Sequence, residues 1–122
     1  MKRGGMYGTG LKARATKLHA EVVRARGRCE RCGSHDTLQC AHIIGRRYNA
    51  TRVDPLNAWC LCAKDHFRLT EHPDEHMAFV ADTIGMDAYF ALKLRAEEGV
   101  KASDAYWQEW IDRLTAMLQE AA

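Results

Sequence analysis

The chain has 122 residues, of which 47% are hydrophobic and 28% charged, the size and composition of one domain with a buried core. Its net charge of +2 conceals a division, because residues 1–52 carry a net +9 and residues 53–122 a net −7. The composition excludes a wholly disordered chain, and no apolar run of about 18–20 residues indicates a membrane span. The basic half predicts a polyanionic partner. No apolar signal region follows the basic N-terminus, so we expect a cytoplasmic protein.

Residues 1–10 contain four glycines and are predicted to form a flexible tail. A helix is predicted over residues 11–26, with an apolar face formed by Leu11, Leu18 and Val22. Gly27 suits the position just past its end.

Residues 29–62 are short, irregular segments punctuated by cysteines. Within them a β-hairpin is predicted, with residues 37–44 and 57–61 as its strands and residues 45–56 as a long loop.

A helix is predicted from Pro73 onward, and proline suits its first position. Gly85 interrupts this run, and a second helix is predicted over residues 87–98. Ser103 can cap a last helix, in which Trp107 and Trp110 are expected to be core residues.

The cysteines are spaced for metal binding. Cys29 and Cys32 form a CxxC pair, and Cys60 and Cys62 follow about thirty residues later, which is the arrangement of a tetrahedral zinc site supplied by two short loops. A redox CxxC is the alternative, but such pairs usually open a helix after a strand. Here Gly33 follows directly, which favours the tight turn of a zinc site.

Three polar residues follow the CxxC pair in the order C-x2-C-x9-H-x14-N-x8-H, namely His42, Asn57 and His66. Over about residues 29–76 this pattern resembles the HNH endonuclease family, and the small chain resembles the stand-alone nucleases of bacteriophages and prophages. The resemblance implies an α+β fold with a zinc-stabilised ββα-metal core, preceded by an N-terminal helix. Two or three helices over residues 77–122 would complete a single domain, 11–122.

The resemblance also implies roles for these residues. His42 would be the general base that takes a proton from the attacking water, and His66 would bind a catalytic Mg²⁺ or Mn²⁺. Asn57 would tie the loop to the hairpin and so orient the base. The loop arginines Arg46, Arg47 and Arg52 match the place where the family meets the DNA backbone, and the forked guanidinium suits phosphate.

The chain departs from the family in two places. Ala41 stands where many members carry a second metal ligand just before the base, and Thr70 replaces a further histidine, with His72 and His76 nearby. The family's closing zinc pair is LCxxCH, whereas this chain reads LCAKDH. The predicted zinc ligands are therefore Cys29, Cys32 and Cys62 with a fourth from Asp65, or failing that Cys60 or Cys40.

The sequence thus predicts a nuclease that nicks or cuts DNA with little sequence preference. A homodimer joined through the C-terminal helices would cut both strands in one encounter, and the resemblance suggests DNA packaging or recombination as settings. The alternative is a non-catalytic zinc-stabilised module that binds DNA or a protein, and Ala41 and Thr70 favour it.

Overall fold

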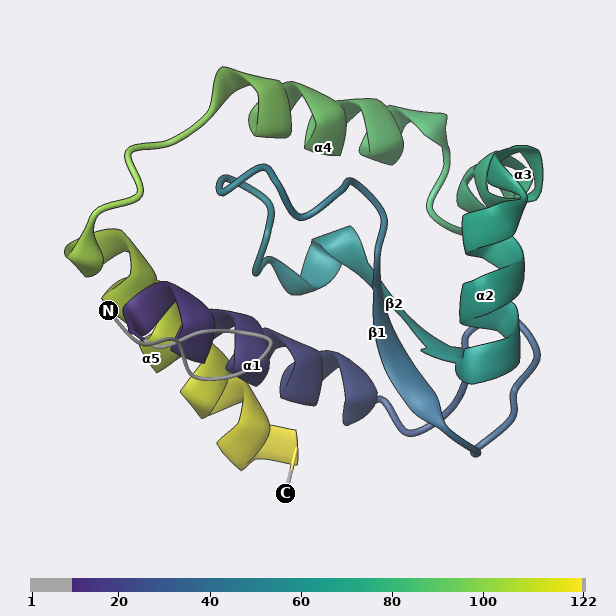
Figure 1. Ribbon diagram of the computed structural model, residues 1–122, viewed down its shortest axis with the longest axis horizontal. Helices are drawn as coiled ribbons and strands as arrows, with labels where there is room; N and C mark the ends of the chain where they lie inside the picture. The colour runs from purple at the N-terminus through teal and green to yellow at the C-terminus, as the bar shows by residue number, and fades with distance from the viewer. Residues whose placement is uncertain (1–9, 122) are drawn as a thin grey trace.

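The computed structural model describes residues 10–121, which form an α+β structure with helices around a two-stranded antiparallel sheet (Figure 1). The elements are α1 (Leu11–Arg24), β1 (Leu38–His42), the 3-10 turn η1 (Pro55–Asn57), β2 (Ala58–Cys62), α2 (Ala63–Glu71), α3 (Pro73–Thr83), α4 (Met86–Glu98) and α5 (Asp104–Ala121). The α+β class predicted from the sequence is therefore confirmed. The tail predicted over residues 1–10 lies outside the described residues, apart from Gly10 at the start of α1.

The predicted hairpin is confirmed, but its first strand is shorter than expected. β1 ends at His42 rather than at residue 44, because the backbone of Ile44 is hydrogen-bonded to the Asn57 side chain instead of to a neighbouring strand. Asn57 Oδ1 accepts from Ile44 N at 2.8 Å, and Asn57 Nδ2 donates to Ile44 O at 3.0 Å. The Asn57 amide thus replaces the next pair of backbone hydrogen bonds between the strands, and the long loop begins at this point.

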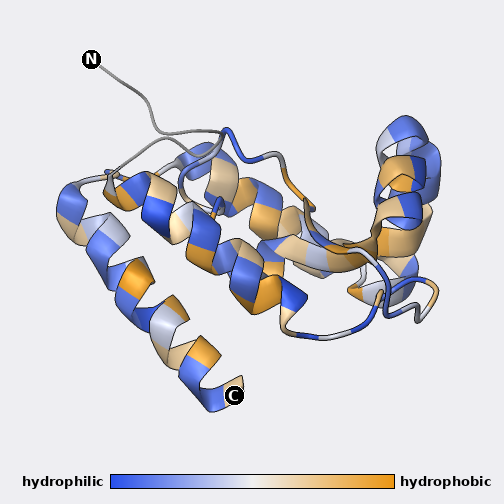
Figure 2. Cartoon of the chain, turned by 60° about the horizontal axis from the view of Figure 1, so that its bottom comes forward, coloured by the Kyte–Doolittle hydropathy of each residue, from blue (hydrophilic) through white to orange (hydrophobic). Residues whose placement is uncertain are grey.

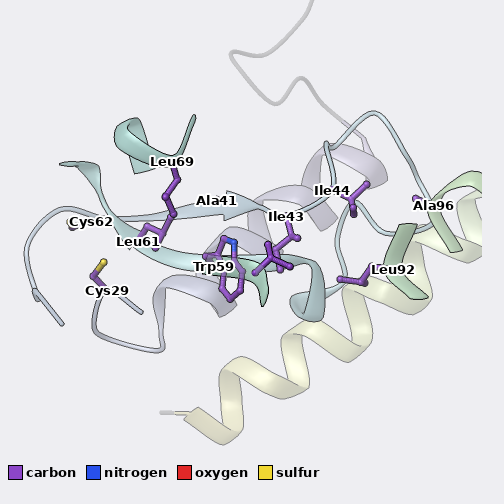
Figure 3. Packing of buried hydrophobic residues seen from close by; sticks show 11 residues of the cluster. Cys29, Ala41, Ile43, Ile44, Trp59, Leu61, Cys62, Leu69, Leu92 and Ala96 are labelled. Carbon is purple, nitrogen blue, oxygen red and sulfur yellow. The ribbon is translucent and has the colours of Figure 1, made fainter. Parts of the chain in front are cut away.

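The sheet lies between two helical layers. Residues Gln39, Ala41 and Trp59 lie on the face covered by α2 and α3, whereas Cys40 and Cys60 lie on the face covered by α1. Figure 3 shows the core on the first face, where Leu69 of α2 lies over Leu61 and the apolar residues of α4 meet the start of the loop. None of the described helices is long and apolar enough to cross a membrane.

α1 buries a different face from the one predicted. The stripe of Leu11, Leu18 and Val22 is only partly buried and packs towards α5, whose Trp107 and Trp110 are core residues as expected. The side chains that α1 buries are instead largely small or polar: Ala13, Ala15, Thr16, His19, Ala20 and Val23. Small side chains let a helix approach its neighbours closely, and the leucines of α1 lie against the α5 cluster. Figure 2 shows hydrophilic and hydrophobic residues alternating along the helices.

Candidate functional site

Four metal-ligating side chains gather where the loop after α1 meets the start of α2. The ligand atoms of Cys29, Cys32, Cys62 and Asp65 all lie within 4.8 Å of one another. Cys32 Sγ is 3.7 Å from Cys62 Sγ, and Cys29 Sγ is 3.2 Å from Asp65 Oδ2. Ligand atoms about 2.0–2.3 Å from a tetrahedral ion are about 3.3–3.8 Å apart. The four residues are therefore close enough to hold a metal ion, with Asp65 in the fourth position.

The local chain conformation explains how the loop delivers its thiols. Gly33 N donates to Cys29 O at 2.9 Å, which closes a tight turn around the CxxC pair. Gly33 has a φ of +81°, and a Cβ there would lie 2.9 Å from the Arg28 guanidinium. The positive φ is the feature that favours glycine here, since the end of the flexible Arg28 side chain can move aside.

Asp65 is held as a carboxylate. Burial acts to raise its pKa, but hydrogen bonds from Cys32, Cys29 and Arg31 outweigh burial and hold the pKa below its usual value. Arg31 Nη1 lies 2.7 Å from Asp65 Oδ1, so one oxygen faces the arginine while Oδ2 faces the thiols. A charged oxygen beside three sulfurs is a donor set that suits zinc.

Cys60 and Cys40 lie outside this group. They are paired across the two strands and face α1, where burial raises the pKa of both thiols, to about 11 for Cys40. Cys62 ends the strand, and its Sγ accepts from Asp65 N at the start of α2. The end of β2 thus separates Cys62 from Cys60, although the two are only two residues apart.

Three histidines line a cavity of about 270 Å³ between the sheet and the α2–α3 layer: His42, His66 and His76. Trp59, Leu61 and Leu69 form apolar walls, and none of the described residues that line it is Asp or Glu. The lining thus contributes no carboxylate that would repel a phosphate.

Within residues 10–121, the His42 ring is hydrogen-bonded through one nitrogen only. Its Nε2 lies 2.8 Å from the Arg52 carbonyl oxygen, which can only accept, so Nε2 carries the proton and Nδ1 the lone pair. Burial lowers the His42 pKa, and the charges of Arg46, Arg52 and His66 lower it further against the opposing effect of the carbonyl. His42 is therefore neutral at pH 7, with Nδ1 able to accept a proton.

His66 has the opposite tautomer. Its Nδ1 lies 2.8 Å from Gln39 Oε1, so Nδ1 donates and Nε2 keeps the lone pair. Burial lowers the His66 pKa, which keeps the ring neutral and able to bind a cation.

The other residues at the cavity offer less to a metal. Trp59 Nε1 donates to His76 Nε2 at 3.0 Å, which uses that lone pair and leaves the His76 proton on Nδ1. The Thr70 hydroxyl donates to the His66 carbonyl at 2.8 Å, and Ala41 has no ligand atom. Among the described residues that line the cavity, the imidazole nitrogens that keep a lone pair without a hydrogen-bond partner are therefore His42 Nδ1 and His66 Nε2.

Asn57 is fully buried and joins the two ends of the loop, just after β1 and just before β2. Besides its two bonds to Ile44, its Nδ2 donates to Thr51 O at 3.1 Å. Asn57 thus ties the loop, and its role in orienting His42 stays a prediction.

The three loop arginines divide into two kinds. Arg46 and Arg47 are exposed, and the Arg47 guanidinium lies 4.6 Å from the Tyr48 ring. Arg52 is half-buried and bonds within the fold, since its Nε donates to Thr16 Oγ1 at 3.0 Å and its Nη1 to Arg46 O at 2.8 Å. Arg46 and Arg47 thus lie at the surface, where Arg47 also donates to the Tyr48 hydroxyl, whereas Arg52 holds the loop.

Comparisons with protein-family models, with curated proteins and with solved structures found no match to this chain.

Sequence reasoning missed His19. This residue of α1 is fully buried, and its ring centroid lies 5.1 Å from that of His42. Burial, followed by the charge of His42, lowers the His19 pKa to about 4. Apolar periodicity gave no signal for it, because the buried face of α1 is made mostly of small and polar residues. The sequence offers one signal: His19 follows Thr16 by three residues, so both lie on the same face of the helix.

Proposed function

We propose that the chain is a metal-dependent endonuclease of the HNH type that hydrolyses DNA phosphodiester bonds with low sequence preference. The observation that carries the proposal is the pair of neutral imidazoles at one cavity, His42 with a free Nδ1 and His66 with a free Nε2. Such a pair can divide the work of hydrolysis, since one nitrogen takes a proton while the other binds a cation.

In this proposal His42 Nδ1 accepts the proton of the attacking water. The positive charge that develops on the ring is stabilised by the Arg52 carbonyl, which already accepts from Nε2. His66 Nε2 would hold Mg²⁺ or Mn²⁺, which supplies neutralisation of the charge on the phosphate and the leaving oxygen. Asn57 keeps the loop against β1, so that the carbonyl stays in place.

The four-residue group would hold a separate, structural zinc. Three sulfurs and one carboxylate favour Zn²⁺ over Mg²⁺ or Ca²⁺, which prefer oxygen ligands. The ion would join the loop at Cys29 and Cys32 to the end of β2 and the first turn of α2. Because α2 also carries His66, this ion would fix the helix that presents the catalytic metal ligand.

DNA would be bound mainly through its phosphates. Exposed Arg46 and Arg47 lie in the loop that follows His42, and the first 52 residues carry the excess positive charge. Contacts of this kind position a duplex without reading its sequence.

A supercoiled-plasmid assay tests the proposal. Zinc-loaded wild type, His42→Ala and the control His35→Ala, which removes an exposed imidazole outside the cavity, are compared with Mg²⁺, Mn²⁺ or excess chelator. We expect open circles from wild type and His35→Ala with metal, and a loss of about 100-fold or more in His42→Ala. Equal activity in all three proteins would contradict the assignment of the base.

The second candidate is a zinc-stabilised module that binds DNA or a protein without cleaving it. It is favoured by Ala41 and by Thr70, whose hydroxyl is bonded within its own helix, because the cavity then offers few metal ligands. Folded wild type that shifts DNA in a gel but leaves plasmid intact with every metal would support this candidate.

A further inference from the structure

We infer that α1 is the positioning element of the proposed base: Thr16 and His19 hold the segment 52–54, and the Arg52 carbonyl of that segment orients His42. This inference deepens the proposed function and rests on it for its catalytic consequence. Its structural content, the orientation of His42, can be measured without any cleavage.

The first contact runs through Thr16. Its hydroxyl donates to Lys12 O at 2.8 Å, so its oxygen is left as an acceptor and takes the Arg52 Nε–H at 3.0 Å. Arg52 Nη1 also donates to Arg46 O, so one side chain joins α1 to both ends of the loop segment 46–52. The carbonyl of the same Arg52 is the one that accepts from His42.

The second contact runs through His19, almost one helical turn later. Its Nε2 lies 3.1 Å from the Asp54 carbonyl, which can only accept, so Nε2 carries the proton. Its Nδ1 faces Cys40 Sγ at 3.7 Å and can accept the thiol proton. His19 is therefore fully buried, neutral and bonded on both sides of its ring.

The two imidazoles hold neighbouring carbonyls of one segment. His42 donates to Arg52 O and His19 to Asp54 O, and the two rings lie 5.1 Å apart at a tilt of 37°. If the segment moved away, His42 Nε2 would lose its acceptor, and the proton could pass to Nδ1, the atom that must stay free. Thr16 and His19 are buried, so loosening either contact should lower the rate of cleavage and leave DNA binding unchanged.

The test combines tautomer spectroscopy with kinetics on the zinc-loaded full chain. Four variants are compared with wild type. His19→Leu removes the donor, His19→Gln retains an N–H near the position of Nε2, and Thr16→Val removes the acceptor. Val23→Ala is the matched control, because Val23 is a buried α1 residue that packs on Ala58 and Cys60 instead of the loop. Long-range proton–nitrogen correlation spectra at pH 8, without added Mg²⁺ or Mn²⁺, report which His42 nitrogen carries the proton. Single-turnover cleavage and gel shifts of a DNA duplex report rate and Kd.

We expect wild type, His19→Gln and Val23→Ala to keep the His42 proton on Nε2. In His19→Leu and Thr16→Val a fraction should move to Nδ1, with cleavage about tenfold slower or worse and Kd within about twofold of wild type.

The inference is overturned if folded Thr16→Val and His19→Leu keep the wild-type tautomer, or if Val23→Ala matches them. Should His19→Leu fail to fold, Thr16→Val decides, since it replaces one side chain by another of equal size. A wild type with no cleavage in any metal would refute the proposed function, while the spectra would still decide the orientation of His42.

Discussion

Each histidine around the cavity carries its proton on the nitrogen that one neighbouring group selects. A carbonyl selects Nε2 in His42, an amide oxygen selects Nδ1 in His66, and an indole N–H selects Nδ1 in His76. In the proposed function two residues of one type would thereby serve as a proton acceptor and a metal ligand, while the third accepts a hydrogen bond from the indole. At the scale of the single residue, the neighbouring hydrogen-bonding group decides which nitrogen of each imidazole carries the proton.

A prediction at the scale of the residue concerns the metal-ligand group of Cys29, Cys32, Cys62 and Asp65. Asp65→Ala removes one ligand and leaves Arg31 without the carboxylate it pairs with, so we expect zinc binding to weaken on the order of tenfold or more. Asp65→Cys should retain zinc and resist a chelator at least as well as wild type. Zinc per chain, measured during chelator titration, checks both, with Asp36→Ala on an exposed loop as the control. Unchanged zinc retention in Asp65→Ala would contradict the fourth ligand.

At the scale of the element, the loop between the strands combines two functions. Its exposed arginines face solvent, while Arg52 attaches it to α1 and Asn57 ties its two ends together. Asp54 adds a third attachment, since its carboxylate pairs with Arg95 of α4. The loop is thus held by α1, by α4 and by its own Asn57, and it remains charged on its outer side.

Because Arg46 and Arg47 are exposed and Arg52 is bonded within the fold, we expect different effects when the charge of each is removed. Arg46→Gln or Arg47→Gln should each reduce the slope of log Kobs for DNA against log salt by about 1, with no change in Tm. Arg52→Gln should leave that slope nearly unchanged and lower Tm instead, because its guanidinium is bonded within the fold. DNA binding titrated over a salt series separates the two classes. Equal slope changes for all three variants would show that Arg52 also meets phosphate.

Local signals in the sequence predicted the elements well. Pro73 starts α3, the Ser103 hydroxyl accepts from Tyr106 N at the start of α5, and the CxxC spacing with Asp65 identified the metal group. The buried face of α1 could not be predicted, because close packing against a sheet selects small side chains and removes the apolar periodicity. The role of His19 likewise depends on a loop 35 residues away, which no local pattern records.

At the scale of the whole molecule, burial of neutral His19 links stability to pH. Its pKa is about 4 in the fold and about 6.5 in the unfolded chain, so the unfolded chain binds more protons between these values. The stability from neutral His19 is fully present above pH 6.5 and is lost as pH falls towards 4. From pH 7 to pH 5 we expect a loss of about 2 kcal/mol in the free energy of unfolding from this residue.

In His19→Gln the free energy of unfolding should fall less from pH 7 to pH 5 than in wild type, because glutamine does not titrate. Denaturant unfolding at pH 7 and pH 5 gives the difference, and protonation of the metal ligands affects wild type and variant alike. A pH dependence identical in the two proteins would mean that His19 is not neutral and buried in solution.

The pH dependence of single-turnover DNA cleavage tests the central claim most directly. Burial and neighbouring positive charges lower the His42 pKa, so the base is already unprotonated at neutral pH. With saturating Mg²⁺ or Mn²⁺, the rate should rise with pH, pass its midpoint below about 6.5 and stay level from about pH 7 to 8. A rate that keeps rising about tenfold per pH unit through pH 8 would contradict the account, because hydroxide, and not water activated by His42, would then be the nucleophile.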